Sequence, residues 1–129
     1  MLHKVRHRLR KHSISFHHAA QGVWWVLRTQ PNYQVHVLMS ILVLVFGLYF
    51  SIRHYEWLVL GVLITMGLVI ETINSALEQT LDCVSLDRRE DIRIAKDAAA
   101  GAMLIFATGA ALIGISIFIP YAASWWLSY

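Results

Sequence analysis

The sequence has few of the residues that break helices, cross-link chains or keep a domain in water. Its 129 residues include two prolines, seven glycines and a single cysteine, Cys83. One cysteine excludes an internal disulfide and a cysteine-based metal cluster. Charged residues make up 15% of the chain, whereas a soluble domain carries about a quarter. Together with an apolar share of 57%, this predicts one domain, residues 1–129, that folds in a lipid bilayer.

Several signatures of phosphate and zinc chemistry are also missing. Neither Gly-x-x-x-x-Gly-Lys-Ser/Thr nor Gly-x-Gly-x-x-Gly occurs, and the seven histidines lack the spacing of zinc proteases. Any phosphate or metal chemistry therefore has to rest on other groups.

Long apolar runs dominate what is present. They place three spans at residues 35–51, 57–81 and 98–119, since a transmembrane helix needs roughly 20 residues. A polar connection from about Cys83 to Asp97 separates the last two spans, and an aromatic segment follows Pro120. We expect an all-α membrane protein with an N-terminal interfacial amphipathic helix and three transmembrane helices. Because three helices bury little surface, we also expect a helical-bundle homo-oligomer, with close packing at Ala107, Ala110, Ala111 and Gly114.

Residues 1–34 comprise a basic segment and the amphipathic helix. Five of the first 11 residues are Lys or Arg. From Phe16 to Leu27 the apolar residues recur at the spacing of one helix face, and Pro31 ends the pattern. A helix of this kind behind a basic run is typical of a membrane interface. The basic run could instead bind nucleic acid, and the helix could pack on the domain, but the neighbouring spans favour the membrane.

Lys and Arg residues are distributed unevenly around the spans. Six precede the first span, Arg53 alone lies in the first turn, and four lie in the second connection. Since positively charged loops stay in the cytoplasm, the N-terminus and the second connection should be cytoplasmic.

The most informative residues lie on one face at the end of the second span. At about 100° per residue, Glu78 and Asp82 fall within about 20° of Glu71, with Asn74 and Ser75 beside them. An ionisable residue inside a span costs roughly 2.5–3.5 kcal/mol, so these carboxylates need a cation or a proton. A magnesium ion shared with phosphates, or a general base for a hydroxyl, would meet that need. Alternatively, Glu78 and Asp82 are solvated beyond the membrane, and Glu71 either extends to the membrane surface or is paired.

The second connection carries another group of charges. Lys96 and Asp97 lie where the chain re-enters the membrane. Lysine there can neutralise a phosphate group, but the pair can equally mark the start of a helix. The charged residues from Asp87 to Asp91 are expected in a solvated loop, which could instead cover a nucleotide.

These residues resemble the small prokaryotic integral-membrane diacylglycerol kinases, a family that includes undecaprenol kinases. The resemblance covers nearly the whole chain. Its most specific elements are Glu71-x-x-Asn74-Ser75-Ala76-x-Glu78-x-x-x-Asp82 and Ala95-Lys96-Asp97-x-x-Ala100. The segment from Ser15-Phe16 through Arg28-Thr29-Gln30 to Asn32 and His36 is similar to the undecaprenol kinase branch.

The resemblance implies a homotrimer in the bacterial plasma membrane, with active sites between neighbouring chains. It implies ATP as co-substrate and Mg²⁺ as cofactor in the phosphorylation of a lipid hydroxyl. Glu71 would accept the hydroxyl proton, and Glu78 would bind the metal that bridges the ATP phosphates. The residues implied in ATP binding are Asn74, Glu78, Asp87, Lys96 and Asp97.

Gln30 departs from the family pattern. It aligns with a metal-sharing glutamate of the best-studied branch, and an amide is a poorer magnesium ligand than a carboxylate. Gln30 is therefore not assigned as a ligand.

We interpret the chain as a lipid kinase whose acceptor is undecaprenol rather than diacylglycerol. An ion or proton transporter would use Glu71 and Glu78 as part of its path, and needs polar residues deep in several spans. From Val37 to Phe50 the first span offers only Ser40 and Tyr49, and the third span mainly Thr108 and Ser116. A non-enzymatic membrane scaffold, in which the carboxylates pair with Lys96 or Arg93 of a neighbour, is the other alternative.

Overall fold

The computed structural model describes residues 2–84 and 89–127, with side chains for residues 15–83 and 89–127. Within these residues the chain forms four helices and no strand: α1 (Leu2–Thr29), α2 (Pro31–Tyr49), α3 (His54–Val84) and α4 (Glu90–Leu127). Of the described helices, α2, α3 and α4 are long and apolar enough to cross a membrane. The predicted all-α membrane fold is therefore confirmed, whereas the homo-oligomer stays a prediction.

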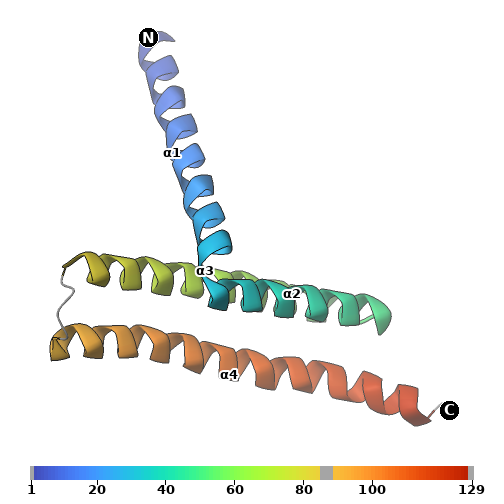
Figure 1. The fold of residues 1–129 in the computed structure, drawn as a ribbon. Helices are drawn as coiled ribbons and strands as arrows, with labels where there is room; N and C mark the ends of the chain where they lie inside the picture. Colours follow the sequence, from blue (N-terminus) through green and yellow to red (C-terminus); the bar gives the residue numbers. More distant parts are fainter. Residues whose placement is uncertain (1, 85–88, 128–129) are drawn as a thin grey trace.

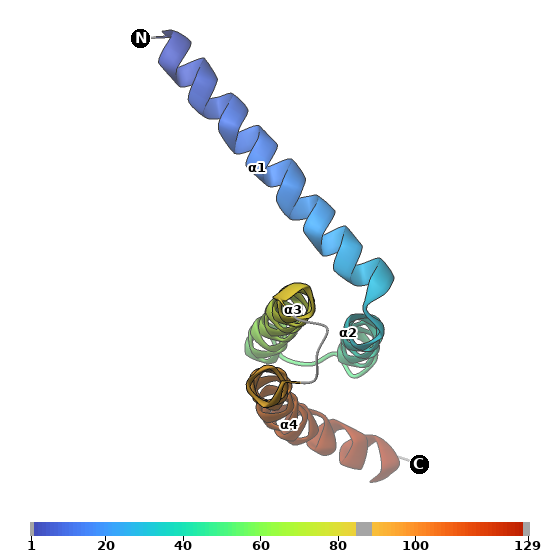
Figure 2. The same ribbon diagram turned by 60° about the vertical axis from the view of Figure 1, so that its left-hand side comes forward.

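The three apolar helices form a bundle from which α1 projects (Figure 1). Figure 2 views this bundle nearly along its axes, with α3 beside both α2 and α4. In the described part of the chain, no Cα atom of α2 lies within 8 Å of a Cα atom of α4. Both outer helices therefore pack on α3 and leave space between themselves.

A single residue, Gln30, separates α1 from α2, and its backbone is extended. Pro31 favours this geometry in the residue before it, and suits the first position of α2 because it has no N–H to satisfy there. The Nε2 group of Gln34 donates to the carbonyl oxygens of Leu27 at 3.1 Å and Arg28 at 3.4 Å. These contacts satisfy carbonyls at the end of α1 and set the direction in which it leaves the bundle.

The turn between α2 and α3 is a tight helix cap. The N–H of Ile52 donates to Gly47 O and that of Ser51 to Leu48 O, each at 3.2 Å, and Ser51 has a φ of 52°. This is the pattern of a Schellman motif. A Cβ atom on Gly47 would lie 2.7 Å from Cη2 of Trp57. Glycine at this position therefore lets α3 approach the end of α2.

The same end of the bundle also holds α4. Glu56 is 9% exposed, and its Oε2 accepts hydrogen bonds from the backbone N–H of Arg53 at 2.7 Å and the hydroxyl of Tyr121 at 2.5 Å. The first bond caps the start of α3, and the second ties it to α4. Ring centroids between α2, its cap and α4 lie 6.2–6.4 Å apart. We call this the aromatic end of the bundle, formed by Phe46, Phe50, Phe118 and Tyr121.

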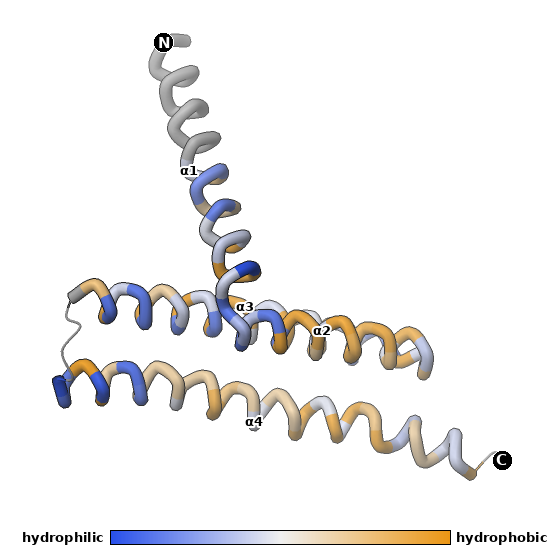
Figure 3. Tube along the Cα trace, in the orientation of Figure 1, coloured by the Kyte–Doolittle hydropathy of each residue, from blue (hydrophilic) through white to orange (hydrophobic). Residues whose placement is uncertain are grey.

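Hydrophilic residues gather at the opposite end of α3 and α4 (Figure 3). We call this the polar end, formed by Glu78, Asp82 and the residues from Arg89 to Asp97. Helix occupies much of the connection expected from Cys83 to Asp97, since α3 reaches Val84 and α4 begins at Glu90. Glu90 and Asp91 lie in the first turn of α4, where negative charge favours a helix start. At its other end, α4 continues through Pro120 to Leu127.

Candidate active site

A polar cavity lies between α2, α3 and α4. Its volume is about 290 Å³, and α3 contributes Glu71, Asn74 and Glu78 to its wall. The other wall residues are Asn32, Val35 and His36 from α2, and Ala100, Met103, Leu104 and Ala107 from α4. The structure thus brings three of the predicted site residues together on one cavity.

The α3 side of this cavity is shielded from solvent. Glu71 is 2% exposed and Asn74 is 6% exposed, while Glu78, two turns beyond Glu71, is only half-buried. The polar groups that act on the Glu71 carboxylate are His36, Glu78 and the amide of Asn74. Removing a carboxylate from water is costly. His36 and the amide of Asn74 offset part of that cost, whereas the second carboxylate, Glu78, adds to it. The cavity therefore combines a shielded carboxylate with room beside it for a reactant.

The donor atoms of the cavity fit a magnesium ion only in part. Oδ1 of Asn74 is buried and accepts no hydrogen bond in the described part of the chain, which is uncommon in native structures. With Glu78 and Glu71 it supplies the hard oxygen donors that Mg²⁺ prefers. Among the described residues, no group of three His, Cys, Asp or Glu side chains could hold a metal. The residues present fit an ion that takes its remaining ligands from phosphate and water.

Asp82 does not line this cavity, although the sequence placed it on the same face. Its Oδ1 accepts a hydrogen bond from Nζ of Lys96, which links the end of α3 to the start of α4. The Lys96 side chain is 33% exposed and that of Asp82 is 53% exposed. Of the three carboxylates predicted on one face of the helix, Glu71 and Glu78 therefore line the cavity, whereas Asp82 forms an ion pair with Lys96.

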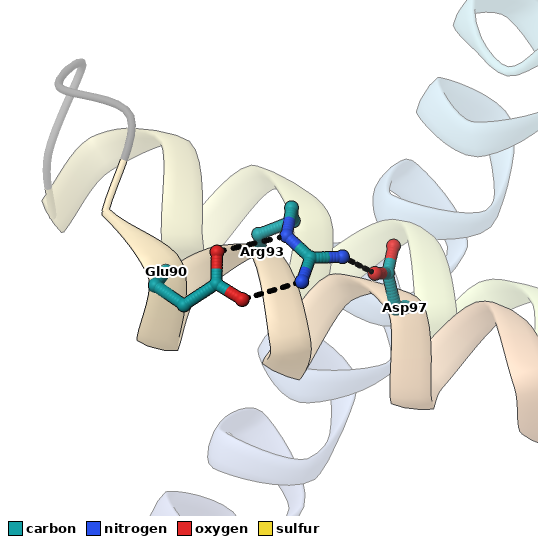
Figure 4. Close-up of polar contacts among 3 residues, drawn as sticks. All are labelled: Glu90, Arg93 and Asp97. Carbon is teal, nitrogen blue, oxygen red and sulfur yellow. Dashed lines mark hydrogen bonds and ion pairs between the residues drawn. The ribbon is translucent and has the colours of Figure 1, made fainter.

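Asp97 is held by a different partner. Figure 4 shows Arg93 between two carboxylates of α4, with Nη1 2.6 Å from Oδ2 of Asp97. The Nε and Nη2 atoms of Arg93 donate to the two carboxylate oxygens of Glu90, at 3.0 and 2.5 Å. All three side chains are more than half exposed. Lys96 and Asp97 are thus adjacent in sequence but belong to separate ion pairs.

An apolar groove of about 420 Å³ adjoins the polar cavity, and His36 and Ala107 line both. Small residues line the groove on all three helices: Ser40, Gly67, Ala110, Ala111 and Gly114. The spacing of the alanines and of Gly114 indicates close helix packing in an oligomer, which stays a prediction; within the single chain these residues line the groove. Phe118 closes the groove at the aromatic end.

Five hydroxyl groups inside the spans donate hydrogen bonds to their own helices. Each donates to the carbonyl four residues earlier, at 2.7–2.8 Å, in Ser40, Thr65, Thr72, Thr108 and Ser116. Such bonds remove the need for water inside a bilayer. Because the polar cavity passes into an apolar groove, the described residues offer no polar path across the bundle, and the transporter alternative is not favoured.

Two residues of the cavity escaped the sequence assignment. Asn32 and His36 lie four residues apart on α2 and face the cavity from the side opposite α4. The signal for them was a pair of polar residues, one helical turn apart, at the start of an otherwise apolar span. Gln30 is half-buried and lies outside the set that lines the cavity. Asp87 lies outside the described residues.

Comparisons with known proteins agree on the class of enzyme. A family model described as prokaryotic diacylglycerol kinase matches residues 17–118. The chain is 36% identical over 115 residues to the undecaprenol kinase of Bacillus subtilis, a match that covers 89% of this chain and 94% of the relative. It is 32% identical over 111 residues to a diacylglycerol kinase of Synechocystis, covering 83% of this chain and 62% of that relative. The segment matched by the family model contains the whole cavity, both ion pairs and the groove.

Proposed function

Because the chain belongs to the prokaryotic diacylglycerol kinase family, we propose that it transfers the γ-phosphoryl group of magnesium-bound ATP to a membrane alcohol, with undecaprenol preferred to diacylglycerol. The chain is a phosphotransferase with an alcohol acceptor. One observation carries the finer proposal: the buried carboxylate of Glu71 faces a polar cavity that continues into an apolar groove. Such a site can present a hydroxyl to a base while the attached chain stays in apolar surroundings.

Glu71 is the proposed general base. Its carboxylate accepts the proton of the acceptor hydroxyl while the hydroxyl oxygen forms a bond to the γ-phosphorus. The bond from that phosphorus to the bridging oxygen breaks, and ADP leaves. Burial at 2% exposure supports this role, because few water molecules can compete with the lipid hydroxyl for the carboxylate.

Glu78 is the proposed metal ligand, and Asn74 orients the groups around it. When bound, Mg²⁺ would neutralise and position the transferring phosphates. The unpaired Oδ1 of Asn74 supports this assignment, because Asn74 lines the cavity together with Glu78 and its Oδ1 lacks a hydrogen-bond partner among the described residues.

The nucleotide is proposed to bind between α3 and α4 at the polar end. Lys96 would contact the phosphates, since an ammonium group has three donors and can keep Asp82 while it binds a phosphate oxygen. Asp97 would bind another part of the nucleotide, and Asp87 stays in the proposed set on the family resemblance alone. The walls of the cavity support this placement, because Glu78 lies one turn from Asp82 and Ala100 one turn from Lys96.

The apolar groove supports an isoprenoid alcohol as the acceptor. Undecaprenol has one polar group, the hydroxyl, which would remain in the polar cavity beside Glu71. Diacylglycerol carries two ester groups, and these lose hydrogen bonds when they leave water. The polar cavity meets the apolar groove at His36, which lines both. The one hydroxyl among the residues that line the groove, that of Ser40, is hydrogen-bonded to its own helix. This junction suits the lipid with the fewer polar groups.

We also propose a homotrimer in the bacterial plasma membrane with the N-terminus in the cytoplasm. The Lys and Arg residues before α2 and between α3 and α4 support that orientation. The partial set of metal donors in one described chain supports a site that a neighbouring chain completes. The interfacial position of α1 is likewise proposed, and its projection from the bundle would allow it to lie along the membrane surface.

The decisive experiment is transfer of labelled γ-phosphate from MgATP to lipid in bicelles. Undecaprenol and diacylglycerol are offered separately to the wild type, Glu71→Gln and Glu78→Gln at matched folding. We expect phosphorylated undecaprenol from the wild type and its loss in both variants. Label in diacylglycerol alone would reverse the proposed lipid preference. A folded oligomer that neither binds ATP nor labels either lipid would overturn the kinase proposal and favour a scaffold.

A further inference from the structure

The proposed nucleotide site contains an electrostatic conflict at Asp97. A carboxylate repels the phosphates of a nucleotide unless its charge is neutralised or turned elsewhere. The adjacent Lys96 does not resolve the conflict, because its recorded ion pair is with Asp82 on α3. The partner of Asp97 is instead Arg93, whose Nη1 lies 2.6 Å from Oδ2. Arg93 therefore forms an ion pair with Asp97, one of the residues proposed to bind the nucleotide.

Arg93 is itself held in a fixed orientation. Its Nε and Nη2 atoms donate to Oε2 and Oε1 of Glu90, at 3.0 and 2.5 Å (Figure 4). A bidentate arginine–carboxylate pair fixes the plane of the guanidinium, which a single contact does not. The remaining nitrogen of the guanidinium, Nη1, then points along α4 to Asp97. Glu90 and Asp97 are spaced three and four residues from Arg93, so the helix supports the whole arrangement.

Arg93 and Asp97 lie on the same face of α4 as residues that line the polar cavity. Arg93, Asp97, Ala100, Leu104 and Ala107 follow one another at alternating intervals of four and three residues, which places them on one face of α4. The last three line the cavity that contains Glu71 and Glu78. A nucleotide whose terminal phosphate lies in that cavity would extend along this face toward Asp97.

We propose that Arg93 is a positioning residue for the nucleotide, which screens part of the charge of Asp97 and holds one of its two carboxylate oxygens. Oδ1 of Asp97, which accepts no recorded hydrogen bond among the described residues, is then directed to accept one from a hydroxyl or amino group of the nucleoside. The phosphates go to Lys96. The inference rests on the proposed function, because it concerns the same nucleotide site.

The test compares nucleotide affinity with turnover in matched variants. Arg93→Gln removes the charge and the bidentate pair, and Arg93→Lys keeps the charge without the planar fork. Arg89→Gln is the control, because Arg89 forms an exposed pair with Asp91 at the same helix end and has no recorded contact with Asp97. We expect Arg93→Gln to raise the KM for MgATP about threefold to tenfold, at little change in kcat. Arg93→Lys should restore part of the affinity, and Arg89→Gln should leave the KM unchanged.

A double-mutant cycle with Asp97→Asn decides whether Arg93 acts through Asp97. Arg93→Gln should have no further effect on KM in the Asp97→Asn background. Equal effects in both backgrounds, a fall in kcat at constant KM, or the same change in Arg89→Gln would each overturn the proposal.

Binding of MgADP by calorimetry repeats the cycle without phosphoryl transfer. It separates the two proposals, because a wild type that binds MgADP but phosphorylates no lipid overturns the proposed function. The MgADP affinities then decide the role of Arg93 independently. If Asp97→Asn leaves the MgADP affinity unchanged, Asp97 has no role in the site and the inference about Arg93 fails.

Discussion

Two glutamates of α3, Glu56 and Glu71, are buried to a similar degree and have opposite surroundings. Glu56 accepts hydrogen bonds from the backbone of Arg53 and the hydroxyl of Tyr121, and so closes the aromatic end. Glu71 faces a cavity, with a second carboxylate, Glu78, among the groups that act on it. Burial is common to both glutamates, so it does not by itself distinguish the proposed base. Glu71 differs from Glu56 because it is buried beside open space.

The aromatic end and the apolar groove also differ in what surrounds their glycines. At the aromatic end, a Cβ on Gly47 would overlap the ring of Trp57, so glycine there permits contact. In the groove, a Cβ on Gly114 would meet nothing within 4 Å, whereas one on Gly67 would lie 2.9 Å from Cε1 of Phe106. Open space beside a glycine is therefore found at Gly114, on the α4 side of the groove.

The largest effect should come from exchanging each buried glutamate for its amide. Glu71→Gln should lower phosphoryl transfer about 10²–10⁴-fold, since it removes the proposed base at constant shape. Glu56→Gln should retain transfer and lower the melting temperature, because it weakens the acceptor for Arg53 and Tyr121. Initial rates and thermal unfolding in bicelles measure the two effects. Activity loss of similar size in both variants would erase the distinction between the two carboxylates.

The next effect concerns the open groove. Gly114→Leu should fold normally and lower transfer to undecaprenol, because the added side chain occupies space that the lipid chain needs. Gly109→Leu is the matched control: its Cβ is equally free, and it does not line the groove. The apparent KM for lipid, measured at fixed MgATP, should rise about tenfold in the first variant alone, as expected for the loss of a well-filled apolar site. Similar values for the two leucine variants would mean that the groove does not bind the acceptor.

A smaller effect is expected at the aromatic end. Gly47→Ala should destabilise the protein by about 1–3 kcal/mol, the usual cost of overpacking a close contact. The new Cβ would lie 2.7 Å from Trp57 and 3.2 Å from Cδ1 of Ile52. Unfolding of the detergent-solubilised protein gives the change, and the KM for lipid should stay constant in the folded fraction. An unchanged stability would show that Trp57 can move freely, contrary to a filled aromatic end.

The smallest effect should be a gain in stability at the turn of the same end. Ser51 has a φ of 52°, a conformation that glycine adopts without steric cost. Ser51→Gly should therefore stabilise the fold by about 0.5 kcal/mol, partly offset by the greater freedom of glycine in the unfolded chain. Thermal unfolding beside Ser124→Gly, a control whose hydroxyl bonds within its own helix, would detect it. A loss of stability in Ser51→Gly would indicate that the serine side chain matters more than its backbone.

Much of the fold follows from the sequence because it depends on local patterns. Apolar runs identified the spans, and the break before Pro31 follows from the chemistry of proline. The α3 face with Glu71, Asn74 and Glu78 was predictable because helical periodicity fixes which residues share a face. These features need only the residues within one helix.

The remaining features depend on how helices meet. The pair between Asp82 and Lys96 joins residues 14 positions apart on different helices, so the periodicity of α3 could not separate Asp82 from the other two carboxylates. The roles of Asn32 and His36 as cavity walls require the packing of α2 on α3. The small residues of α4 line a groove within the single chain because α2 and α4 are separated, which the pattern of α4 alone does not show.

The separation between α2 and α4 has a consequence for how this enzyme meets its lipid. If the acceptor binds as proposed, a groove between two helices whose backbones stay apart would let its long chain rest partly in the protein and partly among other lipids of the bilayer. The acceptor then never has to be lifted out of the membrane. Its encounter with the enzyme becomes a collision in two dimensions, governed by the mole fraction of the lipid in the membrane. Diluting the bilayer with inert lipid should slow the reaction, whereas diluting the suspension with buffer at saturating MgATP should not.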